Sequence, residues 1–458
     1  MSTTNSLSSL TGSLANTGSS TGTSSFGQGI NVQQFVQFAL AGQQANITAL
    51  QNQQTSLSAQ TAEITKISSD LSNLDNAVFA LKDPLGVLSS QVATSSNSAV
   101  VNATASSSAT PGSHSITVNS LATTTSYYTG ALTTSSTTIS AGTFQVKVGS
   151  NAAATVTVDS TNNTLSQLAD TINNQNIGVS ASVIQDSNGY RLALVSTASG
   201  APGDVTVSGN TTGLSFTKAV TGTNASLVVD GIPISSASNT VSNVINGVTL
   251  NLGSASPSTP VTVNVNPDTT QVTSAINTLV NAYNTVITEI NSQFNVAADG
   301  SGGGPLETDN SLREVQSQLL GALSYSISGN SGIVNLASIG VNFNNDGTLS
   351  VDSGKLASTL SNNFSAVQNL LQNTTTGFSQ NLSTVLSNIN SPGTGILSLD
   401  SQSLNNTSQG LSRQLSDLQA ALLVQQANLT TVYSRVNTIL QELPLLESQI
   451  SQQLASVK

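Results

Sequence analysis

Apolar residues recur at helical spacing near the N-terminal end of the chain. The seam advances in steps of three and four from Ile47 to Leu81, with polar residues only at Gln54 and Thr61. This is the heptad pattern of a coiled coil, and its one pair of consecutive threes predicts local overwinding. Pro84 predicts the end of the helix, because the residue before a proline is disfavoured in the α region. The apolar seam positions that we take as candidate assembly residues are Ile47, Leu50, Leu57, Ile64, Ile67, Leu71, Leu74 and Val78.

A second seam, near the C-terminal end, alternates strictly by four and three. Its apolar members are Leu411, Leu415, Leu418, Leu422, Leu429, Val432, Val436, Ile439, Leu443, Leu446 and Ile450. As a helix this run would be a rod of roughly 60 Å. Because an apolar stripe must be covered, we predict that the two terminal seams pair as a coiled-coil or helical-bundle leg. Pro444 lies beside the seam and predicts a kink or a restart of the helix.

Between the two seams, from about 87 to 267, the apolar period changes to two, which predicts β-strands. The alternating runs are Ser115–Leu121, Phe144–Val148, Thr155–Val158, Val179–Ile184, Tyr190–Val195, Leu227–Val229, Val248–Leu252 and Val261–Val265. Turn residues at 186–189, 202–203 and 230–231 separate the runs. One helix is expected, from Leu165 to about Asn174, with Thr164 as its N-cap. We interpret this region as an antiparallel β-rich head of two units that divide near 200–225.

Helices return after Pro267. Asp268 is a candidate cap for the first, and Thr308 or Asp309 for the next, after a glycine-rich loop at 299–304. A hairpin is expected at 339–351, followed by shorter helices at 352–371 and 377–389. The predicted fold is therefore α+β and multidomain. Its parts are a disordered tail at 1–29, an N-terminal helix at 30–86, the head at 87–267, a helical and hairpin domain at 268–400, and a C-terminal helix at 401–458.

Composition excludes several function classes. The 458 residues include no Cys and one His, which argues against Cys-ligated metal sites, disulfides and multi-His cages. Ten Lys+Arg against 21 Asp+Glu give a net charge of −11, which disfavours binding to nucleic acid or to an anionic membrane. No run approaches the ~18 apolar residues of a membrane span. Residues 1–29 carry no charge and no continuous apolar core, so no secretory signal peptide is expected.

Candidate chemical groups all have a simpler structural interpretation. His114 has no acid or second His near it in sequence, and we expect no catalytic or metal-binding role for it. The glycine-rich loop lacks the Gly-Lys-Ser/Thr of a phosphate cradle. The carboxylate pairs Asp309 with Glu314 and Glu442 with Glu447 are expected on solvated helix faces. The sequence thus predicts a protein that is not an enzyme and needs no cofactor.

Several segments resemble the bacterial flagellar filament-capping protein family, also called hook-associated protein 2. Two of them, 165–174 and 190–195, are similar to a motif that flagellins share, so they do not discriminate. Leu81–Leu85 looks like that family's opening segment, and Pro111–Ala122 looks like the strand that follows it. The more specific segments are Val229–Ile234, Ser238–Val241, Gly247–Leu250, Val280–Asn284, and Ile339–Asp352 followed by Lys355-Leu356.

The resemblance implies a homo-oligomeric ring at the flagellum tip, outside the cell, that helps exported flagellin to fold and insert and prevents its loss. It implies flagellin, other hook-associated proteins, the flagellar export apparatus and an export chaperone as partners, and export without a cleaved signal peptide. Two alternatives stay open. One is another flagellar axial protein, such as a hook–filament junction protein or a flagellin-like subunit. The other is an adhesin that uses the β-rich head to bind host surface ligands.

Overall fold

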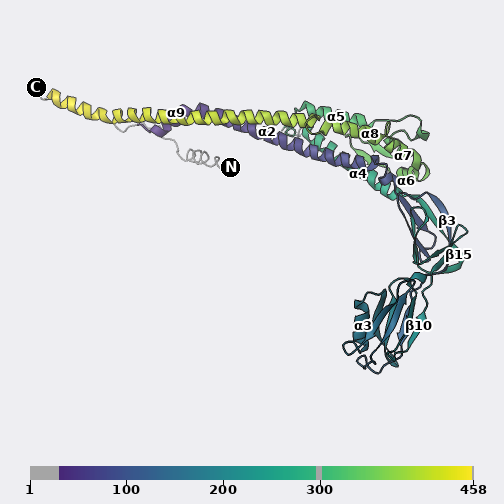
Figure 1. Cartoon of the computed structure of the whole chain (residues 1–458). Helices are drawn as coiled ribbons and strands as arrows, with labels where there is room; N and C mark the ends of the chain where they lie inside the picture. The colour runs from purple at the N-terminus through teal and green to yellow at the C-terminus, as the bar shows by residue number, and fades with distance from the viewer. Residues whose placement is uncertain (1–29, 296–301, 456–458) are drawn as a thin grey trace. The chain divides into compact units, whose positions relative to one another are not determined.

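The computed structural model describes residues 30–295 and 302–455 (Figure 1). The predicted tail at 1–29 lies outside the described residues, as does part of the glycine-rich loop. Two compact units divide the chain: residues up to 69, 289–315 and from 388 onward form the first, and residues 70–288 and 316–387 form the second. The predicted α+β class, with helices at both ends and antiparallel sheets between them, is confirmed.

The two terminal helices are long and uninterrupted. α2 spans Val32–Lys82 and α9 spans Ile396–Ala455. α2 ends where Asp83 accepts the N–H of Leu85 at 3.0 Å, just before the chain turns at Pro84. Of the kink or restart predicted at Pro444, the restart is wrong, because α9 continues through the proline. Pro444 itself and every residue from 441 to 450 are exposed, so the proline ring is accommodated on the solvent side.

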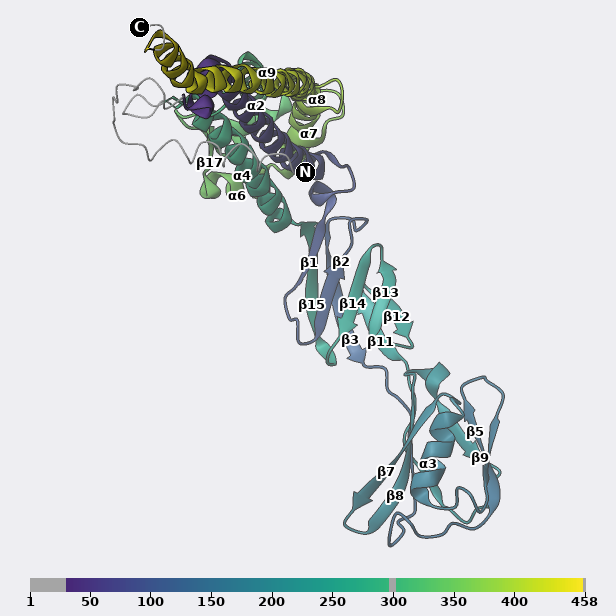
Figure 2. The same cartoon turned by 90° about the vertical axis from the view of Figure 1, so that its left-hand side faces the viewer.

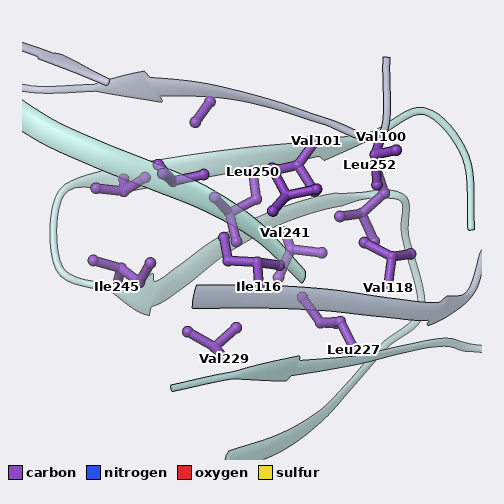
Figure 3. Close-up of a cluster of buried hydrophobic side chains, with 14 of the residues drawn as sticks. Val100, Val101, Ile116, Val118, Leu227, Val229, Val241, Ile245, Leu250 and Leu252 are labelled. Atoms are coloured by element: carbon purple, nitrogen blue, oxygen red, sulfur yellow. The ribbon is translucent and has the colours of Figure 1, made fainter. Parts of the chain in front are cut away.

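The first head core lies between two antiparallel sheets of the second unit (Figure 2). One sheet has the order β1-β15-β3-β11-β12 and the other has the order β13-β14-β2. The strands are β1 (Gln91–Ser95), β2 (Val101–Ala105), β3 (Gly112–Ser120), β11 (Ala225–Val229), β12 (Ile232–Ser236), β13 (Thr240–Ile245), β14 (Val248–Leu252) and β15 (Ser256–Pro267). Figure 3 shows Ile116, Val241 and Leu250 meeting inside this cluster from three different strands.

A second head core is formed entirely by residues between 127 and 216. Its sheets have the orders β10-β4-β8-β7 and β6-β5-β9, and α3 (Leu165–Asn174) packs on β7. Thr164 caps α3 as predicted, through the N–H of Gln167. The strands are β4 (Ser126–Thr129), β5 (Gly142–Val148), β6 (Ala154–Val158), β7 (Val179–Asp186), β8 (Gly189–Ser196), β9 (Val205–Ser208) and β10 (Phe216–Val220).

The remaining elements are α4 (Thr269–Phe294), α5 (Asn310–Leu323), β16 (Val341–Phe343), β17 (Leu349–Val351), α6 (Ser353–Asn362), α7 (Phe364–Gln372) and α8 (Phe378–Asn390). Asp268 caps α4 by accepting the N–H groups of residues 270 and 271, both at 3.1 Å. The hairpin predicted at 339–351 is confirmed as β16–β17. All eight alternating runs predicted in the head lie in strands. Short polar strands such as β1 (QVATS) were not predicted, because their sequences show no apolar alternation.

Candidate functional site

Within the first unit, α2 and α9 lie side by side and antiparallel (Figure 1). The N–H of Ile30 donates to Oδ1 of Asn437 at 2.7 Å. The rings of Phe35 and Tyr433 are 5.8 Å apart between centroids. Further along, Nε2 of Gln43 donates to Oε1 of Gln425 at 2.7 Å. As the residue number rises along α2, the number of its contacting residue on α9 falls by about the same amount, which is the register of an antiparallel pair.

The N-terminal seam is the covered side of α2. Ile47, Ile64, Ile67, Leu71, Leu74 and Val78 are at most 2% exposed, and Leu50 and Leu57 are half-buried. The buried stripe also continues toward the N-terminus through Val36 and Leu40. Sequence reasoning missed this extension, although both residues lie at helical spacing from Ile47, because the polar Gln44 interrupts the pattern.

The C-terminal seam changes its surroundings along α9. Leu411 and Leu415 are 8% and 6% exposed, and Leu422 and Leu429 are half-buried. The rest of the predicted seam is exposed in the single chain, namely Leu418, Val432, Val436, Ile439, Leu443, Leu446 and Ile450.

Two neighbouring stripes on α9 explain this division. Tyr433 and Asn437 face the N-terminal end of α2, where they contact Phe35 and Ile30, and both are half-buried, as is Leu440. The exposed Val432, Val436 and Ile439 each lie one residue earlier, about 100° round the helix. α9 therefore has one stripe toward α2 and a second, apolar stripe toward solvent. We call the second one, from Val432 to Ile450, the open stripe.

Polar contacts join further segments of the first unit. Lys66 Nζ lies 2.5 Å from Oε2 of Glu289 and 3.7 Å from Oε1 of Glu63. Nε2 of Gln60 donates to the carbonyl of Pro305 at 3.1 Å. Contact with Glu289, together with burial, raises the pKa of Glu63.

In the second unit, α4 holds the β16–β17 hairpin through two adjacent side chains. The hydroxyl of Tyr283 donates to the carbonyl of Gly347 at 2.9 Å. Asn284 accepts the N–H of Leu349 at 2.7 Å and donates to its carbonyl at 2.8 Å. Two segments that resembled the cap family separately, 280–284 and 339–352, are thus in direct contact.

His114 does have a partner acid, which the sequence placed more than a hundred residues away. Its Nδ1 lies 2.8 Å from Oδ2 of Asp230, whose Oδ1 accepts the N–H of Ser115 at 2.8 Å. These two hydrogen bonds hold the pKa of Asp230 below its usual range. The pair borders a groove of 460 Å³ lined also by Pro111, Ile232 and other residues. No hydroxyl nucleophile is hydrogen-bonded to His114 among the described residues. The hydrogen bonds of Asp230 to His114 and Ser115 hold the β11–β12 turn against β3.

The expectation of solvated carboxylates is wrong for Asp309. Its Oδ1 accepts the N–H of Leu312 at 3.0 Å and so caps α5, and its carboxyl group meets that of Asp400. Asp400 was not singled out in the sequence, because nothing local marks it. Glu314, Glu442 and Glu447 are exposed, as expected.

Cofactor sites find little support in the part of the chain that the structure describes. There, no group of three or more His, Cys, Asp or Glu residues could hold a metal ion. Over the same residues, none of the helices combines the length and the hydropathy that crossing a bilayer requires. The strongest candidate functional surface is therefore the pair of terminal helices and the open stripe.

Comparison with known proteins identifies matching families at both ends. The model described as the flagellar hook-associated protein 2 N-terminus matches residues 28–125, and the model of its C-terminus matches residues 222–444. The second head core falls between these two matches.

Individual relatives agree along nearly the whole chain. The B-type flagellar hook-associated protein 2 of Pseudomonas aeruginosa is 31% identical over 445 residues, which is 90% of each chain. The flagellar hook-associated protein 2 of Escherichia coli K12 is 29% identical, over 93% of this chain and 96% of the other. The crystal structure of the D1-D2-D3 domains of the E. coli flagellar cap protein FliD covers 75% of this chain and 99% of that one, with a TM-score of 0.57 at 28% identity.

Proposed function

The chain belongs to the flagellar hook-associated protein 2 family, and on that basis we propose that it caps the flagellar filament at its distal tip. Several copies would close into a ring that keeps exported flagellin at the tip and helps it to fold and insert. The low charge of the chain favours this, because little like-charge repulsion opposes subunits that pack side by side.

The observation that carries the proposal is the open stripe. Residues Val432, Val436, Ile439, Leu443, Leu446 and Ile450 follow one another by four and three, and each is between 40% and 60% exposed. Among the described residues, the N-terminal end of α2 contacts the neighbouring stripe as far as Asn437, and the open stripe is left largely accessible to water. Burying a fully exposed side chain of this kind is worth about 1.5–3 kcal/mol, and about half of that is still to be gained at each of these half-exposed positions, which over the whole stripe is a strong drive toward a partner. We assign the open stripe to docking between copies and onto the filament.

One substitution separates this role from folding. Ile439 is 60% exposed, so Ile439→Asp leaves the isolated chain folded. In a dry interface the same carboxylate costs several kcal/mol, so assembly fails. The matched control is Gln441→Asp, which adds the same charge to an exposed position about 200° away round the helix.

The experiment returns each variant to the source bacterium after deletion of its own copy, and measures filament length and flagellin lost to the medium. Wild type and Gln441→Asp restore filaments, whereas Ile439→Asp releases flagellin. If Ile439→Asp caps filaments normally, the open stripe is not the docking element.

The form of the purified assembly separates a cap from another axial protein. A cap closes at a small fixed number of copies, whereas filament subunits polymerise without limit. Negative-stain images that show indefinite fibres would favour the filament-subunit alternative.

A further inference from the structure

Two carboxyl groups meet where α9 begins. Asp309 precedes the first turn of α5 and caps it, and Asp400 lies in the first turns of α9. The two side chains are in hydrogen-bonding contact. Yet Oδ2 of Asp400 is buried and receives no hydrogen bond from a donor of the described residues. Two ionised carboxylates only accept hydrogen bonds, so this contact is favourable only when one of them holds a proton.

No ion pair joins Asp309 or Asp400 to a cation among the described residues, and the only charged group that shifts the pKa of Asp400 is Asp309 itself, so the basic groups of this unit are engaged elsewhere. Arg313, on the same helix as Asp309, lies 4.5 Å from the ring centre of Phe294 and donates to the carbonyl of Glu307. Glu307 accepts the N–H of Gly303. Lys66 is held between Glu63 and Glu289. Glu314 is exposed further along α5.

Burial, and then contact with Asp309, raises the pKa of Asp400 to about 6. Among the titratable groups, only Asp309 contributes to that change. The pair differs in this respect from Glu63 and Glu289, where Lys66 lies between the carboxylates.

We propose that Asp309 and Asp400 form a proton-sensitive joint between α5 and α9. In mildly acidic solution the Asp400 carboxyl O–H donates to the Asp309 carboxylate and ties the two helices together. When that proton passes to water, two carboxylates face each other, and the first turns of α9 are held less firmly. The inference goes beyond capping and does not depend on it.

The sign of the effect follows from linkage. The folded chain holds a proton that the unfolded chain, with an ordinary Asp pKa near 3.9, has already lost. The joint therefore contributes most stability below about pH 4, and that contribution falls as the pH rises through about 6. This is the reverse of the usual behaviour of carboxylates that are paired with cations.

The test compares calorimetric unfolding of the full chain and two single variants from pH 5 to 8 and follows the transition that includes α9, because a chain with several domains does not melt in one step. Asp400→Asn places an amide donor against Asp309 at every pH. Asp309→Asn does the same from the other side and keeps the cap, since Asn caps as well as Asp. Asp417→Asn is the control, because Asp417 is exposed on the same helix. Differences from wild type isolate the joint, because the head contributes equally to every chain.

We expect Asp400→Asn and Asp309→Asn to melt a few degrees above wild type at pH 7.5, with the gap closing near pH 5. Hydrogen exchange of residues 396–410, corrected for intrinsic rates, should slow in both variants at pH 7.5 only. Asp417→Asn should show neither change. A gap that is the same at pH 5 and 7.5 overturns the proposal. If one variant fails to fold, the other still decides the question.

Discussion

Replacing Asn284 with alanine removes both hydrogen bonds that tie α4 to strand β17. The Asn284 side chain pairs with the N–H and the C=O of Leu349, as a neighbouring strand would. Leu349 is itself only 3% exposed, so water reaches its backbone poorly. The substitution therefore leaves a buried donor and a buried acceptor without protein partners.

The expected cost follows from these two groups. Each buried polar group left without a partner costs about 1–3 kcal/mol. Allowing for partial access by water and for the better helix propensity of alanine, we expect Asn284→Ala to lower stability by about 2–4 kcal/mol. Tyr283→Phe removes a single hydrogen bond, to Gly347, and should cost about 1 kcal/mol.

Hydrogen exchange is the suitable assay, because a chain with several domains does not unfold in one step. Protection of the hairpin at 341–351 reports the local free energy of opening. Asn281→Ala is the control, since Asn281 is exposed one turn earlier on α4. Asn284→Asp keeps an acceptor for the Leu349 N–H but places a carboxylate oxygen against the Leu349 carbonyl oxygen. Its hairpin protection should therefore lie between those of wild type and Asn284→Ala.

The reasoning fails if Asn284→Ala exchanges at the hairpin as slowly as Asn281→Ala does. It also fails if protection is lost equally in the head strands, because the defect would then be global. Loss confined to the hairpin and its neighbours is the result that supports the clamp.

Three further predictions concern the head. Leu250→Ala empties a site that is 1% exposed in the first core, and should cost about 2–5 kcal/mol, measured by calorimetry of the head transition. Thr164→Ala removes the cap on the N–H of Gln167 and should cost about 1 kcal/mol, seen as faster exchange in the first turn of α3. The lowered pKa of Asp230, caused first by the hydrogen bond from His114, contributes stability above the ordinary Asp pKa, and this is lost as the pH falls. Wild type should therefore lose its advantage over Asp230→Asn as the pH falls below the ordinary Asp pKa, followed by calorimetry of the head transition, and an unchanged gap would contradict that pair.

Local sequence patterns were sufficient to predict a strand or a helix cap wherever that feature depends on its own residues. The alternation in Phe144–Val148 and Val248–Leu252 is a strand in each case, because one side of each faces a core. Asp268 and Thr164 cap the helices that they precede, since a cap needs only the next few N–H groups.

The same reasoning could not find the contacts that join distant segments. The sequence did not indicate that Asp230 pairs with His114, or that Asp400 pairs with Asp309. Nothing near any of these residues in sequence points to its partner. Asn284 lies within a helical pattern that would be the same if its side chain faced water.

The sequence by itself determined the kinds of elements, most of their positions, and the presence of apolar stripes at both ends of the chain. The spacing of apolar residues is a local property, so it can be read from the sequence without knowing which element packs against them. Only the tertiary structure decided which stripe of α9 meets α2 and which, from Val432 to Ile450, stays open. Near Tyr433 and Asn437 the two stripes are one residue apart, and which of them is covered depends on the direction from which α2 approaches.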